Sequence, residues 1–408
     1  MVDTKYPNIR LGDICSMPPR NGIYKKTENL SSGVRLIKMN ELFSKRYIKN
    51  DDFAEFINLT SSEKEKLLIN NNDLLFSRTS VVADGVGMCS LVIIGNYEFT
   101  WDSNIIRIRL NNNTVPRYYF YFFNSPLGRN MVTSLASGAT VTTITGKNLL
   151  ELNVPSPKLN VQQKIASILS AYDDLIENNS RRIKILEEIA QSIYRERFVT
   201  TKESYKTVKI SDFGQIVTGK TPSKKIEENF NQKYIRFIKT PDMHGNLFCL
   251  ETTEWLSEIG ANSQKNKTIP VNSICVSCIG TGGVISITAC DAQTNQQINT
   301  IIPSKEYYLE YLYFSLKDLK QVMLNIGSKG ATMMNLNKAE FGNIDIKKPN
   351  DILIENFHKL VNPIFELVKN LQIKNINLSQ TKNLLLPKLI SGDLDIEDLD
   401  IKIRPEIL

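Results

Sequence analysis

Histidine is scarce in this chain, since only His244 and His358 occur among its 408 residues. Two histidines leave little material for histidine-based catalysis or a histidine-bound metal, so no catalytic site, metal or other cofactor is expected. The six cysteines lack the paired spacing of a disulfide framework, which indicates reduced thiols. Cys275 and Cys278 have the spacing of two zinc ligands, but no second pair follows, and small buried thiols are the better interpretation.

Long apolar runs are also absent. No stretch approaches the roughly 20 apolar residues that cross a bilayer, and the first residues, MVDTKYPNIR, lack the apolar core of a signal peptide. We therefore expect no membrane partner and a cytoplasmic location. The composition, with 41% hydrophobic and 23% charged residues, is typical of a soluble globular protein, and the net charge of +7 is compatible with a polyanionic partner.

The sequence contains an internal repeat. The stretch GVRLIKMNEL (33–42) recurs as YIRFIKTPDM (234–243), which aligns Lys38 with Lys239. Later segments align at one shorter offset, which places Tyr121 opposite Tyr313. A register that holds and then shifts once indicates two copies of one module that differ in the length of a loop.

Each copy has two parts. The first part is punctuated by Gly, Asn and Pro and carries short β-type runs such as NIIRIRL. After a proline-marked boundary, apolar residues recur every three or four positions, which is the spacing of a coiled-coil seam. We therefore predict an α+β fold with an internal pseudo-two-fold repeat. Its parts are β-rich domains at 1–157 and 201–349, a central helix at 158–200, and a distal helix with a C-terminal tail at 350–408.

The apolar face of these two helices forms the predicted seam. It consists of Ile165, Ile168, Tyr172, Leu175, Leu186 and Ile189 in the central helix and Leu360, Ile364, Leu371 and Leu378 in the distal one. Asn179 also falls on the seam, where a lone Asn commonly fixes the pairing register. Pro363 predicts a kink or a later start of the distal helix. Ordinary bundle helices are the alternative for both stretches.

The stretch GQIVTGKT, Gly214–Thr221, matches the pattern of a phosphate-binding loop. That loop requires a buried strand before it and a helix that begins at its Lys and Thr. The preceding residues alternate between apolar and polar, and Pro222 follows the motif directly. A flexible basic loop is therefore the preferred interpretation, and an ATPase is the disfavoured one.

The order of these parts resembles the specificity (S) subunits of type I restriction–modification systems, and the resemblance covers essentially the whole chain. Its most specific marks are QQKIASILSAYDDLIENNSRRI (162–183) and LLLPKLISGDLDI (384–396), and its weaker marks include TGKTPS (218–223) and RFIK (236–239). The resemblance implies that each β-rich module is a target recognition domain that reads one half of a bipartite, asymmetric site in double-stranded DNA. It also implies that the two helices run antiparallel, set the spacing of the half-sites and dock two methyltransferase (M) subunits, which restriction (R) subunits join. Adenine methylation and DNA cleavage would then belong to those partners, and this chain would be non-catalytic.

Basic residues are the candidates for DNA contact under this interpretation. They stand at corresponding places in both copies, in loops, or beside strand ends, and they are Arg20, Lys38, Arg78, Lys147, Lys220, Lys239, Lys329 and Lys338. For each of them a solvated surface charge is the alternative. Two other functions remain open, namely a stand-alone two-headed DNA-binding protein and an assembly scaffold that binds no DNA.

Overall fold

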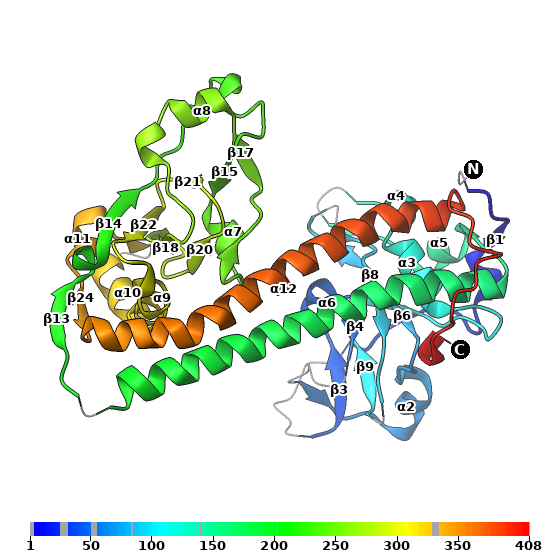
Figure 1. Cartoon of the computed structure of the whole chain (residues 1–408). Helices are drawn as coiled ribbons and strands as arrows, with labels where there is room; N and C mark the ends of the chain where they lie inside the picture. Colours follow the sequence, from blue (N-terminus) through cyan, green and yellow to red (C-terminus); the bar gives the residue numbers. More distant parts are fainter. Residues whose placement is uncertain are drawn as a thin grey trace. The chain divides into compact units, whose positions relative to one another are not determined.

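The chain forms two compact units in a computed structural model, which describes residues 4–24, 32–49, 55–82, 85–95, 97–138, 141–201, 203–328 and 334–407 (Figure 1). Unit 1 comprises Met1–Leu175 and Leu378–Leu408, and unit 2 comprises Ile176–Asn377. Each unit holds one β-rich module and about half of each long helix, which confirms the α+β architecture predicted from the repeat. Within the described ranges, no helix is long and apolar enough to cross a membrane.

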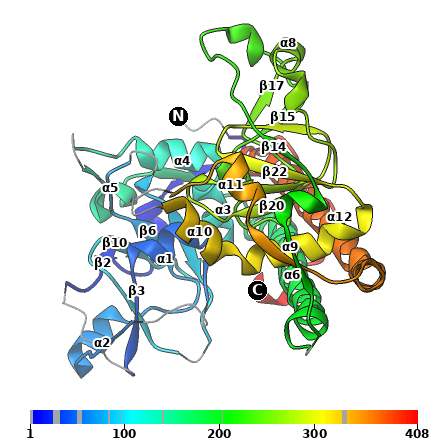
Figure 2. The same cartoon turned by 90° about the vertical axis from the view of Figure 1, so that its left-hand side faces the viewer.

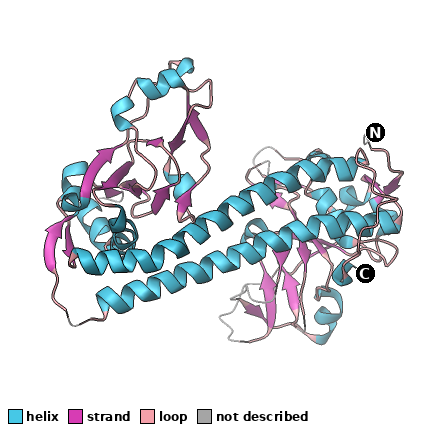
Figure 3. Ribbon diagram, viewed as in Figure 1, coloured by secondary structure: helices cyan, strands magenta, loops and turns pink. Residues whose placement is uncertain are grey.

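The two long helices are α6 (Leu159–Tyr194), which a π-helix at Arg195–Val199 continues, and α12 (Asp351–Ser391) (Figure 3). In unit 1 the first half of α6 packs with the last half of α12, and Leu169 and Leu389 share one core. In unit 2 the last half of α6 packs with the first half of α12, where Ala190 and Phe365 share another core. The helices therefore pair antiparallel, as predicted.

Pro363 does not delay the start of α12. The helix begins at Asp351 and continues without interruption to Ser391, so the predicted later start is wrong. Proline removes one backbone hydrogen bond from a helix interior. Packing compensates for this loss, because Val361 and Phe365 on either side of Pro363 lie in the core of unit 2.

Unit 1 contains a five-stranded sheet in the order β2-β10-β6-β8-β4 and a three-stranded sheet in the order β5-β3-β9. Figure 2 labels β2, β10 and β6 of the first sheet and β3 of the second. The strands of these sheets are β2 (Arg20–Asn21), β3 (Val34–Ile37), β4 (Tyr47–Ile48), β5 (Phe56–Ile57), β6 (Leu74–Ser77), β8 (Cys89–Val92), β9 (Phe99–Trp101) and β10 (Ile105–Ile108). Two further pairs join β1 (Asn8–Arg10) to β12 (Asn153–Pro155) and β7 (Thr79–Ser80) to β11 (Thr142–Thr143). The helices of the module are α1 (Met39–Ser44), α2 (Ser61–Leu67), α3 (Pro116–Phe123), α4 (Pro126–Thr133) and α5 (Gly146–Leu150).

Unit 2 repeats this topology, with sheets in the orders β14-β22-β18-β20-β16 and β17-β15-β21. The strands are β14 (Gly214–Thr218), β15 (Ile235–Ile238), β16 (Phe248–Cys249), β17 (Glu254–Leu256), β18 (Ile274–Ser277), β20 (Ile285–Thr288), β21 (Ala292–Thr294) and β22 (Ile298–Pro303). The smaller pairs join β13 (Lys206–Lys209) to β24 (Asp345–Lys348) and β19 (Ile279–Gly280) to β23 (Met334–Asn335). The helices are α7 (Thr240–Met243), α8 (Glu258–Asn262), α9 (Leu309–Asp318), α10 (Lys320–Ser328) and α11 (Lys338–Gly342).

Each long helix buries its apolar face mainly against the β-rich modules. Every residue of α3 from Arg117 to Phe123 is buried, and this helix shares a core with Ile165 of α6. In unit 2, α9 shares a core with Tyr194 and Phe357 in the same way. A fully buried Phe or Leu side chain contributes about 1.5–3 kcal/mol, so these contacts hold each module on its helix pair.

Part of the predicted seam is displaced in the structure. Because the helices pack against the modules, the residue that follows a predicted seam position is buried in its place at two positions. Leu175, Ile189 and Leu360 are 52%, 45% and 45% exposed, whereas the neighbouring Ala190 and Val361 are fully buried. The other predicted seam residues are buried or half-buried: Ile165, Ile168, Tyr172, Leu186, Ile364, Leu371 and Leu378. A helix that faces both a partner helix and a sheet domain buries a wider stripe than an isolated coiled coil does.

Candidate functional site

Four of the predicted DNA-contacting residues are exposed. Arg20 lies on β2, Lys147 on α5, Lys220 in the loop after β14, and Lys338 on α11. Thr145 and Asn337 accept hydrogen bonds as the N-caps of α5 and α11, so Lys147 and Lys338 lie in the first turns of equivalent short helices. Lys329 lies outside the described residues.

Lys38 and Lys239 are engaged by carboxylates at corresponding positions. Nζ of Lys38 lies 2.5 Å from Glu55, and Nζ of Lys239 lies 2.8 Å from Glu254. The hydrogen bond from Lys239 is the main cause that lowers the pKa of Glu254. Since Arg35 pairs with Phe56 and Arg236 with Trp255 across equivalent strands, the two ion pairs are copies of one feature. A DNA phosphate would have to compete with these carboxylates.

Arg78 is half-buried between β6 and β7. Its backbone N–H donates to the carbonyl of Asn104 at 2.7 Å, and its carbonyl accepts from the N–H of Ile144 at 3.0 Å. Its guanidinium Nη1 lies 3.5 Å from the carbonyl of Ser103. The backbone of Arg78 thus joins several segments of the module.

The loop Lys220–Ile226 does not form a phosphate cradle. Residues Gly214–Thr218 of the motif form β14, and the backbone N–H of Lys220 donates to the carbonyl of Thr294 at 2.9 Å. A Cβ on Gly219 would lie 2.1 Å from the carbonyl oxygen of Asn295, so this close approach requires glycine. No helix begins at Lys220, and the next helical turn is the 3₁₀ segment Glu227–Asn229.

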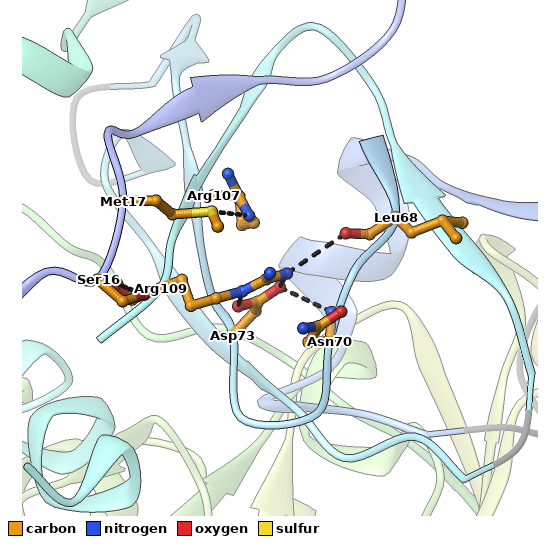
Figure 4. Close-up of polar contacts among 7 residues, drawn as sticks. All are labelled: Ser16, Met17, Leu68, Asn70, Asp73, Arg107 and Arg109. Atoms are coloured by element: carbon orange, nitrogen blue, oxygen red, sulfur yellow. Dashed lines mark hydrogen bonds and ion pairs between the residues drawn. The ribbon is translucent and has the colours of Figure 1, made fainter. Parts of the chain in front are cut away.

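Two arginines on β10 and just beyond it form a charged cluster that the sequence interpretation missed (Figure 4). Nε and Nη2 of Arg109 donate to the two carboxylate oxygens of Asp73, each at 2.7 Å. Asp73 is fully buried and also accepts from the N–H of Asn70 at 2.8 Å. Such a bidentate pair with an added hydrogen bond fixes both side chains. The alternating run NIIRIRL was the available signal, because it places two charges in an apolar strand.

Arg107 lies nearby on β10 and is 3% exposed. Its Nη1 is 2.8 Å from Sδ of Met17, and its guanidinium lies 5.3 Å from the centre of the Trp101 ring. Its Nε has no hydrogen-bond partner among the described residues. Burial lowers the pKa of Arg107, and the neighbouring charges of Arg109 and Arg20 lower it further, opposed by Asp73. β2 and β10 thus place Arg20 beside a buried arginine at one sheet edge.

The corresponding positions in unit 2 carry no charge. The strand pairings align Arg107 with Thr300 and Asp73 with Ser273. The two modules therefore share their strand order but differ in polarity along the equivalent strands.

The three-stranded sheet of unit 2 carries a half-buried arginine–tryptophan pair. The guanidinium of Arg236 lies 4.9 Å from the centre of the Trp255 ring, and its Nη1 lies 2.8 Å from Sγ of Cys290. A cavity of about 500 Å³ is lined by Arg236, Trp255 and Lys265, among others, and a second of about 610 Å³ includes Trp255, Lys233 and Lys224. An aromatic ring flanked by basic side chains can stack on a base or bind a phosphate.

The six cysteines are free thiols that are buried or half-buried. Within the described part of the chain, no group of three His, Cys, Asp or Glu side chains could hold a metal ion. Burial raises the pKa of the Cys15 and Cys278 thiols to about 11 and of Cys275 to about 12, and it raises those of Cys89 and Cys249 still further. These thiols are therefore protonated at neutral pH.

Known proteins share both the sequence features and the fold of this chain. A family described as the type I restriction modification DNA specificity domain matches residues 4–188 and 202–380. The type I restriction enzyme HindI specificity subunit of Haemophilus influenzae is 31% identical over 408 residues, covering 81% of this chain and 88% of that protein. The MjaIX specificity subunit of Methanocaldococcus jannaschii is 24% identical over 372 residues and covers 85% of each chain. The crystal structure of a type I S subunit from M. genitalium has the same fold, with a TM-score of 0.62 at 14% identity over 95% of this chain and 96% of its own.

Proposed function

This chain belongs to the type I restriction modification DNA specificity family, and we propose on that premise that it is the specificity subunit of a type I restriction–modification complex. In this role each β-rich module reads one half of a bipartite site in double-stranded DNA. The observation that carries the proposal is the duplication of the recognition module, which is matched by two copies of the family domain. Two reading modules allow a single chain to read both halves of a bipartite site.

The differences between the modules support an asymmetric site. Unit 1 carries Arg107 and the Arg109–Asp73 pair where unit 2 carries uncharged residues. Unit 2 has Trp255 opposite Arg236 where unit 1 has Phe56 opposite Arg35. Base readout depends on the hydrogen-bonding and apolar groups that a few side chains present to the grooves. Two modules with one scaffold and different side chains would therefore read different half-sites.

The long helices would set the distance between the half-sites. α6 has 36 residues and is thus about 54 Å long at 1.5 Å per residue. Half-site separation follows from protein geometry in two-headed DNA-binding proteins. The exposed apolar side chains Leu175, Ile185 and Ile189 on α6 would be available to the methyltransferase subunits.

Phosphate contacts would supply most of the affinity. We assign this role first to the exposed residues Arg20, Lys147, Lys220 and Lys338. The paired residues Lys38 and Lys239, the half-buried Arg78, and Lys329 stay weaker candidates.

The chain would act in a complex and carry no chemistry of its own. Two methyltransferase subunits would supply adenine methylation, and restriction subunits would supply cleavage. The domain boundaries at residues 157, 200 and 349 and a cytoplasmic location belong to the same proposal.

The test is a genome-wide map of adenine methylation with and without the gene for this chain, in cells whose methyltransferase partner is active. We expect one bipartite motif to disappear on deletion, and an unchanged map would contradict the proposal. Co-purification distinguishes the alternatives, because a stand-alone DNA-binding protein would bring down no methyltransferase. An assembly scaffold would show no affinity for duplexes that carry the motif.

A further inference from the structure

The joint between the first β-rich module and the long helices contains a buried ion pair. In unit 1, Lys382 of α12 pairs with Asp173 of α6, and their side chains are 4% and 14% exposed. The hydroxyls of Tyr47 on β4 and Tyr121 on α3 both donate to Oδ2 of Asp173 at 2.7 Å. Nζ of Lys382 also lies 5.5 Å from the centre of the Tyr121 ring. Four elements of unit 1 therefore meet at one carboxylate.

The protonation states suit this arrangement. Burial is the main cause that raises the pKa of Tyr47 and of Tyr121 well above the usual range, so both hydroxyls keep their protons. Burial lowers the pKa of Lys382, and the charge of Asp173 opposes that shift. Asp173 thus accepts hydrogen bonds from two neutral donors and one amine.

The four equivalent positions in unit 2 carry no charged side chain. The offset that aligns Tyr121 with Tyr313 also aligns Asp173 with Phe365 and places Ala190 in the position of Lys382. The equivalent pairings of β4 with β8 and of β16 with β20 align Tyr47 with Phe248. The ring of Phe365 lies 5.6 Å from that of Tyr313 and 6.3 Å from that of Phe248. Ala190 is fully buried in the same core. The same place in the repeat is thus held by aromatic packing in one unit and by a charged network in the other.

Aromatic packing and a charged network differ in how far they let a helix slide along its module. Apolar packing is non-directional, whereas a charge-assisted hydrogen bond needs a short distance and good alignment. Any slip of the helices would leave a buried charge without its partner, which is strongly destabilising. A slip of one heptad would move one helix by about 10.5 Å, or about three base pairs at 3.4 Å each. The network of Asp173 therefore disfavours any slip of the helices that is large enough to change the spacer by a few base pairs.

We infer that Asp173 is a positioning residue that holds the first recognition module in a single register on the helix pair, and thereby restricts the spacer length that the complex accepts. This inference rests on the proposed function and assigns Asp173 no contact with DNA. Unit 2 holds α12 by a polar contact at a different place, where the fully buried Glu310 of α9 contacts His358 and Asn362.

The test uses the full chain in complex with its methyltransferase partner. Duplexes carry the two half-sites from the methylation map, separated by the natural spacer or by spacers about one to three base pairs shorter and longer. For Asp173→Asn and Lys382→Met, we expect methylation of the altered spacers, relative to the natural one, to rise by about tenfold, the effect of one charge-assisted hydrogen bond. The double variant removes both charges together, so it should fold even where a single variant does not, and it should show the same loss of selectivity.

Leu169→Ala is the matched control. Leu169 lies one turn from Asp173 on α6 and is fully buried, so its truncation lowers stability by leaving a cavity without touching the network. We expect this variant to keep the natural spacer selectivity at a similar loss of Tm. Unchanged spacer selectivity in the double variant would overturn this inference but leave the proposed function intact. If Leu169→Ala lost spacer selectivity to the same extent, the inference would also fail, because Asp173 would then have only a structural role. An unsubstituted complex that methylates no bipartite motif would instead overturn the proposed function.

Discussion

The side chain of Asn179 on α6 donates a hydrogen bond of 2.9 Å from Nδ2 to Oδ1 of Asn375 on α12. Asn375 in turn donates to the carbonyl of Ile176 at 3.3 Å and to the hydroxyl of Ser180 at 3.2 Å. Asn179 is 9% exposed. A buried amide pair in an apolar seam costs stability and specifies register.

The asparagine pair gives a first prediction. Replacing both residues by leucine should raise the stability of unit 2 by about 1 kcal/mol, or roughly 2–4 °C in Tm, because the polar groups are removed together. Asn179→Leu alone should gain less, since Asn375 then loses a partner. Thermal unfolding followed by circular dichroism measures the difference. Asn178→Leu, on the exposed neighbour, is the control and should give no gain.

The ion pair between His358 and Glu310 predicts a pH dependence of stability. Nδ1 of His358 lies 2.7 Å from Oε2 of Glu310, which is fully buried. This hydrogen bond is the main cause that raises the pKa of His358, with help from the charges of Glu310, Glu306 and Glu355 and against the effect of burial.

Because the folded pKa is raised, the stabilisation is complete below the unfolded value of about 6.5. It is lost as pH rises through the folded pKa. The difference in Tm between the unsubstituted chain and His358→Gln should therefore be largest below about pH 6.5 and should shrink as the pH rises through the raised folded pKa. A constant difference for His358→Gln would contradict the prediction.

Removing Arg109 should destabilise unit 1 strongly. Arg109→Ala leaves the buried carboxylate of Asp73 without its partner, which typically costs about 3–5 kcal/mol. Urea unfolding can be followed through the buried Trp101 in a Trp255→Phe background, because the chain has only these two tryptophans. Arg10→Ala, which breaks the exposed pair with Glu151, should cost less than about 1 kcal/mol.

The salt dependence of DNA binding should distinguish a lysine that contacts a phosphate from one that is paired with a carboxylate. If Lys220 contacts a phosphate, Lys220→Gln should weaken binding to a duplex with the motif and reduce the slope of log K against log salt by about 0.9. Lys239→Gln should change that slope little, because Lys239 is paired with Glu254. Equal slopes for both variants and the unsubstituted chain would remove Lys220 from the DNA-contacting set.

The repeat and the long helices could be predicted because both leave a periodic pattern in the sequence. The repeat was visible because equivalent residues keep a common offset, and the long helices because apolar residues recur every three or four positions. Asn179 was placed correctly on the seam for the same reason. Ile189 and Leu360 were not, because the modules pack on the helices and turn the buried face toward Ala190 and Val361.

The charged contacts could not be predicted from the sequence, because they depend on which strands pair and in which register. Asp73 and Arg109 come together only when β10 pairs with β6, and Lys38 reaches Glu55 only when β3 pairs with β5. These pairings join segments that are distant in the sequence, so the residues that they bring together belong to no common local pattern. Basic residues could therefore be named from the sequence, but not divided into paired and free ones.

The burial of the thiols makes the chain suitable for site-specific fluorescent labelling. Four of the six cysteines are buried, and only Cys15 and Cys290 are partly reached by solvent. A cysteine introduced at the exposed position of Lys147 or Lys338 would react with a maleimide dye far faster than these native thiols. A donor on one module and an acceptor on the other would then report their separation in solution by energy transfer, before and after a duplex is added.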